Sequence, residues 1–216
     1  MKKAISIFLL ALLCLNAAAH PVVNYALAGE GIANVALYYF KLGVMHIIPA
    51  GLDHILFIVS LCLLSTNVKT IVWQATAFTL AHTVTLALSM KSIIVAPSNI
   101  VEPIIALSIV FVAIENIILQ ELKPWRIIIV FLFGLIHGMG FASVLNEIGI
   151  PPDRFVSSVL FFNLGVEAGQ LSIILTVFGC IIYPIGKSKE YRKYFVYPIS
   201  TIIALVATWW TIERLM

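Results

Sequence analysis

The stretch HIIPAGLDHILFIVSLCLL, residues 46–64, places an aspartate and a histidine directly before an apolar run. Asp53 and His54 are followed by ten residues, of which only Ser60 is polar. A charged side chain at the centre of a membrane helix costs about 2.5–3.5 kcal/mol on insertion scales. The stretch therefore indicates either a polar cap at the end of a membrane helix or a site that takes a cation from water into the bilayer.

The composition of the whole chain is that of a membrane protein. Of its 216 residues, 62% are hydrophobic and 11% are charged, and the mean hydropathy is +1.08. A soluble domain carries about 25% charged residues. We therefore expect an all-α, polytopic helix bundle in the lipid bilayer. No basic run in the sequence is interleaved with aromatic residues, so a nucleic-acid partner is not expected.

The first nineteen residues are typical of a cleavable signal peptide. Lys2 and Lys3 precede the apolar stretch 4–15, and three alanines at 17–19 form a small-residue cleavage site. The apolar stretch is shorter than the about 20 residues that a membrane span needs. An uncleaved anchor is the alternative. We expect a signal peptide at 1–19, an outer segment with a possible interfacial helix at 20–48, and the transmembrane bundle at 49–216.

Six later stretches are apolar and long enough to be expected as membrane helices. A further helix is expected over 31–48, where Pro49 and Gly51 would break or kink it. That helix either lies in the membrane interface or lengthens the first span. The six expected spans are 50–67, 70–90, 101–120, 127–147, 157–183 and 195–213.

Basic residues predict the orientation of the bundle. The loops expected inside hold seven of them and the outer segments hold four, in agreement with the positive-inside rule. We expect a multi-pass protein of the bacterial inner membrane, with the mature N-terminus outside and Asp53 and His54 at the outer end of the first span. The seven are Lys69, Lys123, Arg126, Lys187, Lys189, Arg192 and Lys193, and the four are Lys41, Lys91, Arg154 and Arg214.

Polar side chains recur at helical spacing within the expected spans. Those of the second span lie on one helical face, and so do those of the fifth. Each polar residue taken alone could serve helix packing, as could the glycines 134, 138 and 140. The second-span face is Thr76, Thr79, His82 and Thr83, and the fifth-span face is Asn163, Glu167 and Gln170; Glu115, Asn116 and His137 lie in the third and fourth spans.

Taken together, the ionisable residues indicate a metal site, because so many would be costly in a bilayer without a function. Imidazole nitrogen and carboxylate oxygen suit nickel, cobalt, zinc or copper as divalent ions, whereas magnesium and calcium prefer oxygen shells. No prosthetic group is expected. The candidate ligands are His46, Asp53, His54, His82, Glu115, His137, Glu167 and His20. Cleavage of the signal peptide before His20 would expose the α-amino group of this residue as a further ligand.

Five blocks of the sequence resemble the HupE/UreJ membrane proteins. They are HIIPAGLDHILF, FTLAHTVTLAL, VEPIIALSIVFVAIEN, FGLIHGMGFA and FNLGVEAGQL, and they cover roughly residues 40–180. The resemblance implies a nickel or cobalt permease, with nickel-enzyme maturation proteins as partners. It also implies that His46, Asp53 and His54 form the first histidine–aspartate motif, followed by His82, His137 and Glu167 in later blocks.

The expected mechanism uses two sites. Asp53 and His54, with His46, would take the ion at the outer face, and His82, His137 and Glu167 would hold it deeper. Glu115, with Asn116, would carry the ion or a proton toward the cytoplasm. A metal-binding sensor or assembly partner without transport is one alternative, and an intramembrane metalloenzyme is another. An enzyme is not expected, because the sequence has neither H-E-x-x-H nor G-x-S-x-G.

Overall fold

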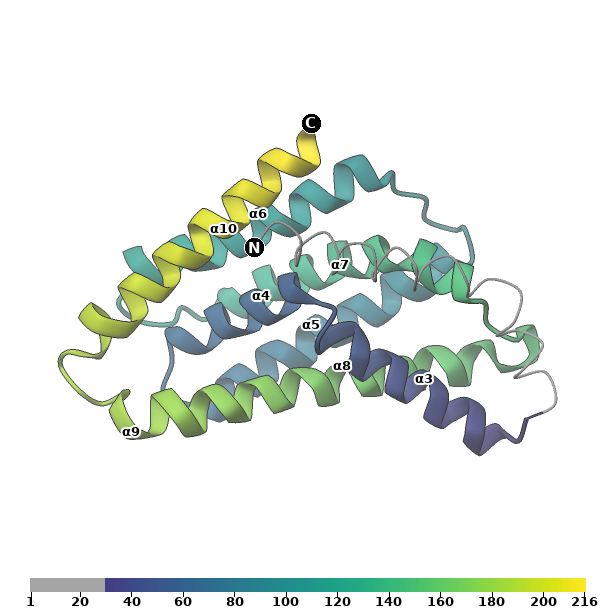
Figure 1. Ribbon diagram of the computed structural model, residues 1–216, viewed down its shortest axis with the longest axis horizontal. Coiled ribbons are helices and arrows are strands. Elements are labelled where there is room, and N and C mark those ends of the chain that lie inside the picture. Colours follow the sequence, from purple (N-terminus) through teal and green to yellow (C-terminus); the bar gives the residue numbers. More distant parts are fainter. Residues whose placement is uncertain (1–29) are drawn as a thin grey trace, which may run out of the picture.

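The computed structural model describes residues 30–216, and within this range every regular element is a helix (Figure 1). The expected all-α bundle is therefore confirmed. The signal peptide and His20 lie outside the described residues. The helices are α3 (Ile32–Ile47), α4 (Leu52–Leu63), α5 (Val68–Met90), α6 (Ser98–Ile118), α7 (Arg126–Ile148), α8 (Phe155–Val177), α9 (Tyr183–Ile185) and α10 (Tyr197–Leu215), with a 3-10 turn at Pro152–Arg154 and π-helical turns at Phe178–Ile182 and Arg192–Val196.

Five segments of the described chain are long and apolar enough to cross a bilayer, and the bent pair α3 and α4 is a sixth when it is counted as one span. This agrees with the expectation of about six spans. Four of these five segments begin and end within a few residues of the expected spans. The segment Pro152–Ile185 begins earlier than the expected span 157–183. The five segments are Val68–Met90, Ser98–Ile118, Arg126–Ile148, Pro152–Ile185 and Arg192–Leu215.

The first span differs from the one expected over 50–67. Helix α4 has 12 residues, fewer than the about 20 needed to cross a bilayer. It meets α3, which has 16 residues, at a bend of 69°. Pro49 lies in the break, where its missing N–H and its ring prevent a continuous helix.

The connections at one end of the bundle, residues 64–67, 119–125 and 186–191, are held together by hydrogen bonds. The Tyr191 hydroxyl donates to the Leu63 carbonyl oxygen at 3.3 Å. The Arg192 guanidinium donates to the carbonyl oxygens of Asn116 at 3.1 Å and Leu119 at 2.9 Å. We call this the basic end, because most of the basic residues expected inside lie there.

The opposite end carries the start of α3. The Arg154 guanidinium, beside the start of α8, donates to the Glu30 carbonyl oxygen at 2.8 Å. The Tyr39 hydroxyl donates to the carbonyl oxygen of Gly149, just after α7, at 2.6 Å. Because α3 begins at this end and α4 finishes at the basic end, the two helices form one broken crossing segment. The helix expected over 31–48 thus lengthens the first span.

Glycines bring α5 and α7 into backbone contact. A Cβ atom added at Gly134 would overlap the Phe78 carbonyl oxygen, and one at Gly138 would overlap the His82 carbonyl oxygen. The packing role suggested for these two glycines is therefore confirmed, since small residues let membrane helices approach closely. A Cβ atom added at Gly140 would instead lie 2.8 Å from the end of the Ile105 side chain on α6.

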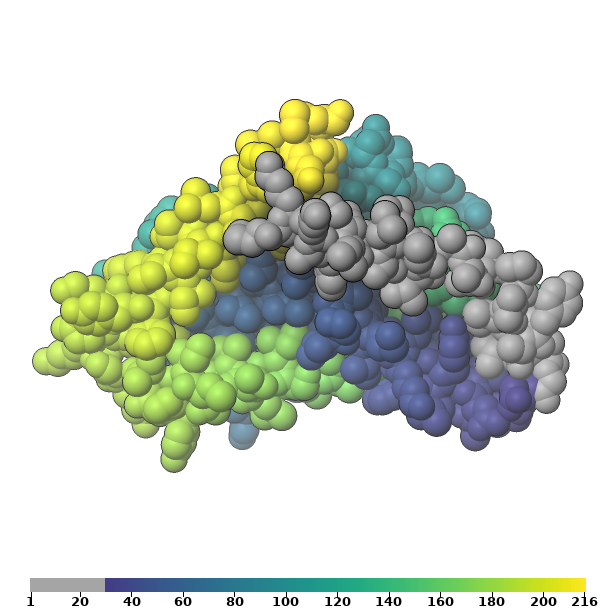
Figure 2. Space-filling view, viewed as in Figure 1, coloured from purple at the N-terminus to yellow at the C-terminus, as the bar shows by residue number. Residues whose placement is uncertain are grey.

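Helices α3 and α8 are joined in the same way. A Cβ atom at Gly43 would overlap the Phe162 carbonyl oxygen, and one at Gly165 would overlap the Phe40 carbonyl oxygen. Helices α6 and α10 form a further pair, and α4 lies among the pairs (Figure 1). In the space-filling view, α10 in yellow and α8 in green form separate ridges with α4 in blue between them (Figure 2).

Candidate metal site

Three histidines from three helices meet in the middle of the bundle. His46 lies at the end of α3, His54 in the first turn of α4 and His82 within α5. One ligand atom from each lies within 4.8 Å of the others. Imidazole nitrogens bind zinc-like ions at about 2.0–2.1 Å, which places two ligands of a tetrahedral ion about 3.3 Å apart. Small side-chain rotations would therefore bring the three nitrogens onto one ion.

The break between α3 and α4 allows His46 and His54 to meet. Their ring centroids are 4.7 Å apart. A Cβ atom at Gly51 would overlap the His46 carbonyl oxygen and lie 3.3 Å from Nδ1 of His54. The glycine therefore leaves the space in which the end of one helix approaches the start of the next.

His137 of α7 is the fourth histidine of this group. Its ring centroid lies 5.2 Å from that of His54. Its side chain is buried, as are those of His54 and His82. We call His46, His54, His82 and His137 the histidine cluster.

Three of the four imidazoles have an oxygen atom beside Nδ1. An ionised carboxylate and a backbone carbonyl can only accept, so the ring nitrogen must donate to them. The Asn163 amide nitrogen donates to the Val159 carbonyl oxygen at 2.8 Å, which turns its oxygen toward the ring. The pairs are His54 with Asp53 Oδ1 at 3.0 Å, His82 with Asn163 Oδ1 at 3.0 Å, and His137 with the Phe133 carbonyl oxygen at 2.8 Å.

This arrangement leaves Nε2 of those three rings with a free lone pair, because a neutral imidazole carries one proton. All four Nε2 atoms of the cluster are buried, and none has a hydrogen-bond partner among the described residues. A buried polar atom without a partner costs about 1–3 kcal/mol. Metal-binding histidines are oriented in the same way, with the second ring nitrogen donating to an oxygen.

Phenylalanines enclose the cluster toward the basic end. The ring centroids of Phe57 and Phe78 lie 5.6 Å and 4.8 Å from that of His137. The two phenylalanine rings are 5.2 Å apart, and Phe133 lies 6.1 Å from Phe57. Each of these three follows or precedes a cluster histidine by three or four residues on its own helix, on the side of the basic end.

Two more phenylalanines cover the cluster toward the opposite end. Phe141 and Phe162 stack with centroids 5.3 Å apart and an interplanar angle of 10°. The His46 ring lies 3.9 Å from Phe141 and 5.6 Å from Phe162. The histidine cluster is therefore enclosed between two layers of aromatic rings.

A stripe of polar side chains continues from the cluster between α5 and α8. Thr76 donates to Glu167 Oε1 at 2.6 Å, and Thr79 donates to Gln170 at 3.2 Å. The second carboxylate oxygen of Glu167 is buried without a hydrogen-bond partner in the described structure. The two polar faces predicted from spacing thus pack against each other.

Glu115 lies in another group of polar residues, near the basic end. Its carboxylate is 3.1 Å from Nε of Arg126, and both side chains are buried. Arg126 also donates to Asn116 at 3.3 Å, and Asn116 donates to the Ser60 carbonyl oxygen at 2.7 Å. We call these four residues the Arg126 network. No described contact joins Glu115 to the histidine cluster.

The structure does not separate the expected outer site from the deeper one. Asp53 and His54 lie in the middle of the bundle, because α3 continues from them toward the opposite end. His46, His54, His82 and His137 form one group, whereas Asp53 lies behind His54 and contacts its Nδ1. The Phe133 carbonyl oxygen had no sequence signal, since any residue offers a backbone carbonyl.

Comparison with known families gives one match. The model of the family described as HupE / UreJ protein matches residues 19–214, almost the whole chain. Among curated proteins and solved structures, none is similar enough to count as a match.

Proposed function

This chain belongs to the HupE/UreJ family, and we propose that it is a permease for a divalent transition metal, nickel or cobalt. The family consists generally of membrane proteins related to nickel and cobalt transport, and it is a transporter-type family. The observation that carries the proposal is the group of four buried Nε2 atoms without partners. A cation bound among them would satisfy the Nε2 lone pairs of His54, His82 and His137, whose Nδ1 atoms face oxygens. A ligand atom of His46 lies within 4.8 Å of ligand atoms of His54 and His82.

The donor atoms favour this class of ion. Imidazole suits nickel, zinc and copper, and carboxylate-rich sites suit magnesium and calcium instead. The described thiols are not beside the cluster: Cys180 is exposed, and Cys62 lies in α4 two turns beyond His54. Zinc and divalent copper share the same donor preference, so both belong in any binding experiment as competitors.

The proposed path begins at the opposite end, where the stacked Phe141 and Phe162 would have to part. The ion would then bind the histidine cluster, and Glu167 with Thr76 would receive it on the way to the basic end. We assign to Asp53 the task of orienting His54, and we assign to Glu115 the task of neutralising Arg126. His20 remains a proposed outer ligand.

We further propose that the basic end faces the cytoplasm of a bacterium, with the mature N-terminus outside its inner membrane. The basic loops at that end support this orientation. Nickel-enzyme maturation proteins would then receive the ion at the basic end. The second candidate function, a sensor or assembly partner that binds metal without transport, rests on the same buried histidines.

Metal flux into proteoliposomes tests the proposal. The wild-type protein should accumulate nickel or cobalt, and the variant Asp53→Ala/His54→Ala should lose both the flux and the metal-dependent rise in thermal stability. Thr83→Val is a matched control, because the Thr83 hydroxyl donates only to the Thr79 carbonyl of its own helix. Binding without flux would support the sensor instead. Unchanged melting temperatures with nickel, cobalt, zinc and copper would overturn both functions.

A further inference from the structure

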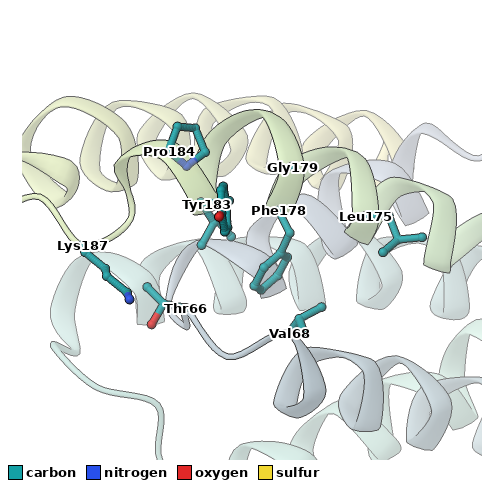
Figure 3. A pocket seen from close by; sticks show the side chains of 9 residues that line it. Thr66, Val68, Leu175, Phe178, Gly179, Tyr183, Pro184 and Lys187 are labelled. Carbon is teal, nitrogen blue, oxygen red and sulfur yellow. The ribbon is translucent and has the colours of Figure 1, made fainter.

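A groove of about 860 Å³ lies at the basic end, between the end of α8 and the connection that precedes α5 (Figure 3). Leu175 lines it from α8, Phe178 from the π-helical turn that follows α8, and Val68 from the start of α5. Lys187 and Thr66 lie together at one end of the groove, and Leu175 lies at the other (Figure 3). The groove thus has a polar end and an apolar end.

The groove owes its shape to the end of α8. The helix changes there to a π-helical turn over Phe178–Ile182. Such turns are rare in proteins, and those that occur often lie at functional sites. Gly179 lies in this segment and lines the groove, and a Cβ atom added to it would meet nothing within 4 Å. The missing side chain therefore leaves open space.

The polar end is cationic. Lys187 is the charged residue of the lining, which contains no carboxylate among the described residues. Its ammonium group forms no hydrogen bond or ion pair with any residue of 30–216 that the structure records. The neighbouring Thr66 hydroxyl can donate a hydrogen bond to an anion beside the lysine.

We propose that this groove binds an anionic phospholipid, with its phosphate headgroup at Lys187 and Thr66 and an acyl chain along Val68, Phe178 and Leu175. Leu175 and Phe178 belong to the candidate crossing segment Pro152–Ile185, and Val68 begins the candidate segment Val68–Met90, so the proposal places the apolar wall against lipid tails. Leu175 is 66% exposed, which leaves it free to contact a chain. Basic pockets between membrane helices bind the headgroups of anionic lipids.

The lengthwise order of the lining supports a lipid over a soluble ligand. A phospholipid of the adjacent leaflet presents its headgroup at the membrane surface and its tails toward the centre. The groove presents Lys187 beyond the end of the crossing segment and Leu175 within it. From the membrane surface toward the centre, the charged and apolar parts of the groove therefore follow the same order as the headgroup and tails of the phospholipid. The inference does not depend on metal transport, because no residue of the groove belongs to the histidine cluster or the Arg126 network.

Native mass spectrometry of the full chain in detergent tests the inference, with phosphatidylglycerol and phosphatidylcholine of identical acyl chains as probes. Phosphatidylglycerol should bind more tightly to the wild type. Lys187→Gln should weaken its binding about fivefold, as expected for one lysine near an anionic lipid. Lys189→Gln is the matched control from the same loop, because Lys189 does not line the groove, and it should leave binding unchanged.

Gly179→Leu tests the apolar half of the groove. The Cβ atom of the leucine would meet nothing within 4 Å, so the larger side chain should occupy open space beside the groove and abolish selective binding, while the melting temperature without added lipid stays close to wild type. Equal binding of the two lipids to the wild type would overturn the inference. So would equal losses in Lys187→Gln and Lys189→Gln, or full binding in Gly179→Leu.

Discussion

The histidine cluster and the Arg126 network are both buried groups of polar side chains in the same bundle, but their charges are arranged differently. In the Arg126 network a cation lies 3.1 Å from an anion, so each compensates for the burial of the other. In the histidine cluster the groups are alike, and four buried Nε2 atoms have no hydrogen-bond partner among the described residues. In the first group charges of both signs offset each other, although Nε and Nη1 of Arg126 and both carboxylate oxygens of Glu115 form no hydrogen bond that the structure describes. In the second group, the metal that we propose would supply the cation.

The comparison separates structural polar residues from functional ones in a membrane protein. Both groups contain residues that are costly in lipid, so cost alone does not distinguish them. The distinguishing observation is that the Arg126 network pairs a cation with an anion, whereas the histidine cluster brings together four side chains of the same kind. Removing a residue from the first group should therefore mainly change stability, and removing one from the second should mainly change metal binding.

The largest effect is expected for Arg126→Met. The substitution leaves the Glu115 carboxylate buried without its partner, which costs about 3–5 kcal/mol for a broken buried pair. The melting temperature of the purified, metal-free protein should fall sharply. The double variant Arg126→Met/Glu115→Leu should recover most of the loss, because no charge is left unpaired. A double variant as unstable as the single one would contradict the pairing.

A smaller effect on stability and a larger one on binding are expected for His82→Ala. The substitution removes one of the four Nε2 atoms that we propose as metal ligands. The affinity for nickel should therefore fall by more than the about 10–100-fold loss expected when only a hydrogen-bond partner of a ligand is removed. Isothermal titration with nickel checks this, with Thr83→Val as the control. Loss of metal-free stability as large as in Arg126→Met would show that the cluster is structural.

A moderate effect is expected for Asn163→Leu. The side-chain oxygen of Asn163 accepts from Nδ1 of His82, so its loss frees the ring to change tautomer and orientation. Nickel affinity should fall about 10–100-fold. Thr176→Val on the same helix is the control, because its hydroxyl donates only to the Ser172 carbonyl. Unaltered affinity in Asn163→Leu would remove Asn163 from the site.

The smallest effect is expected for Thr76→Val. The Thr76 hydroxyl donates to Glu167, and hydrogen bonds between membrane helices average about 0.6 kcal/mol. The melting temperature should therefore hardly change. Nickel binding at the histidines should also persist, whereas flux into proteoliposomes should slow. Wild-type flux in Thr76→Val would place the ion path elsewhere.

The sequence predicted the helices well because each apolar run is long and bounded by proline, glycine or charged residues. It also predicted that the polar faces of α5 and α8 exist, since both repeat every three or four residues. Their mutual contact through Thr76 and Glu167 depends on the order of packing, which spacing along one helix does not contain.

The depth of Asp53 and His54 was not predictable from their own stretch. Their position before an apolar run is typical of a helix end at the membrane surface. The 69° bend places a second helix before them, so the same residues lie at mid-depth. The partner of Glu115 was equally hidden, because Arg126 was counted among the loop residues that set the orientation, although the structure buries it.

The glycine contacts of α5 and α7 have a consequence for ion discrimination. Gly134 and Gly138 keep the two backbones at a fixed separation, and these helices carry His82 and His137. Intrinsic affinity rises from cobalt through nickel to copper, so a protein cannot favour cobalt or nickel by ligand strength alone. Under the proposed function, selection of one ion would therefore rest on the coordination geometry that the packed helices offer. The two glycines make that packing possible, because a Cβ atom at either position would overlap a carbonyl oxygen of α5.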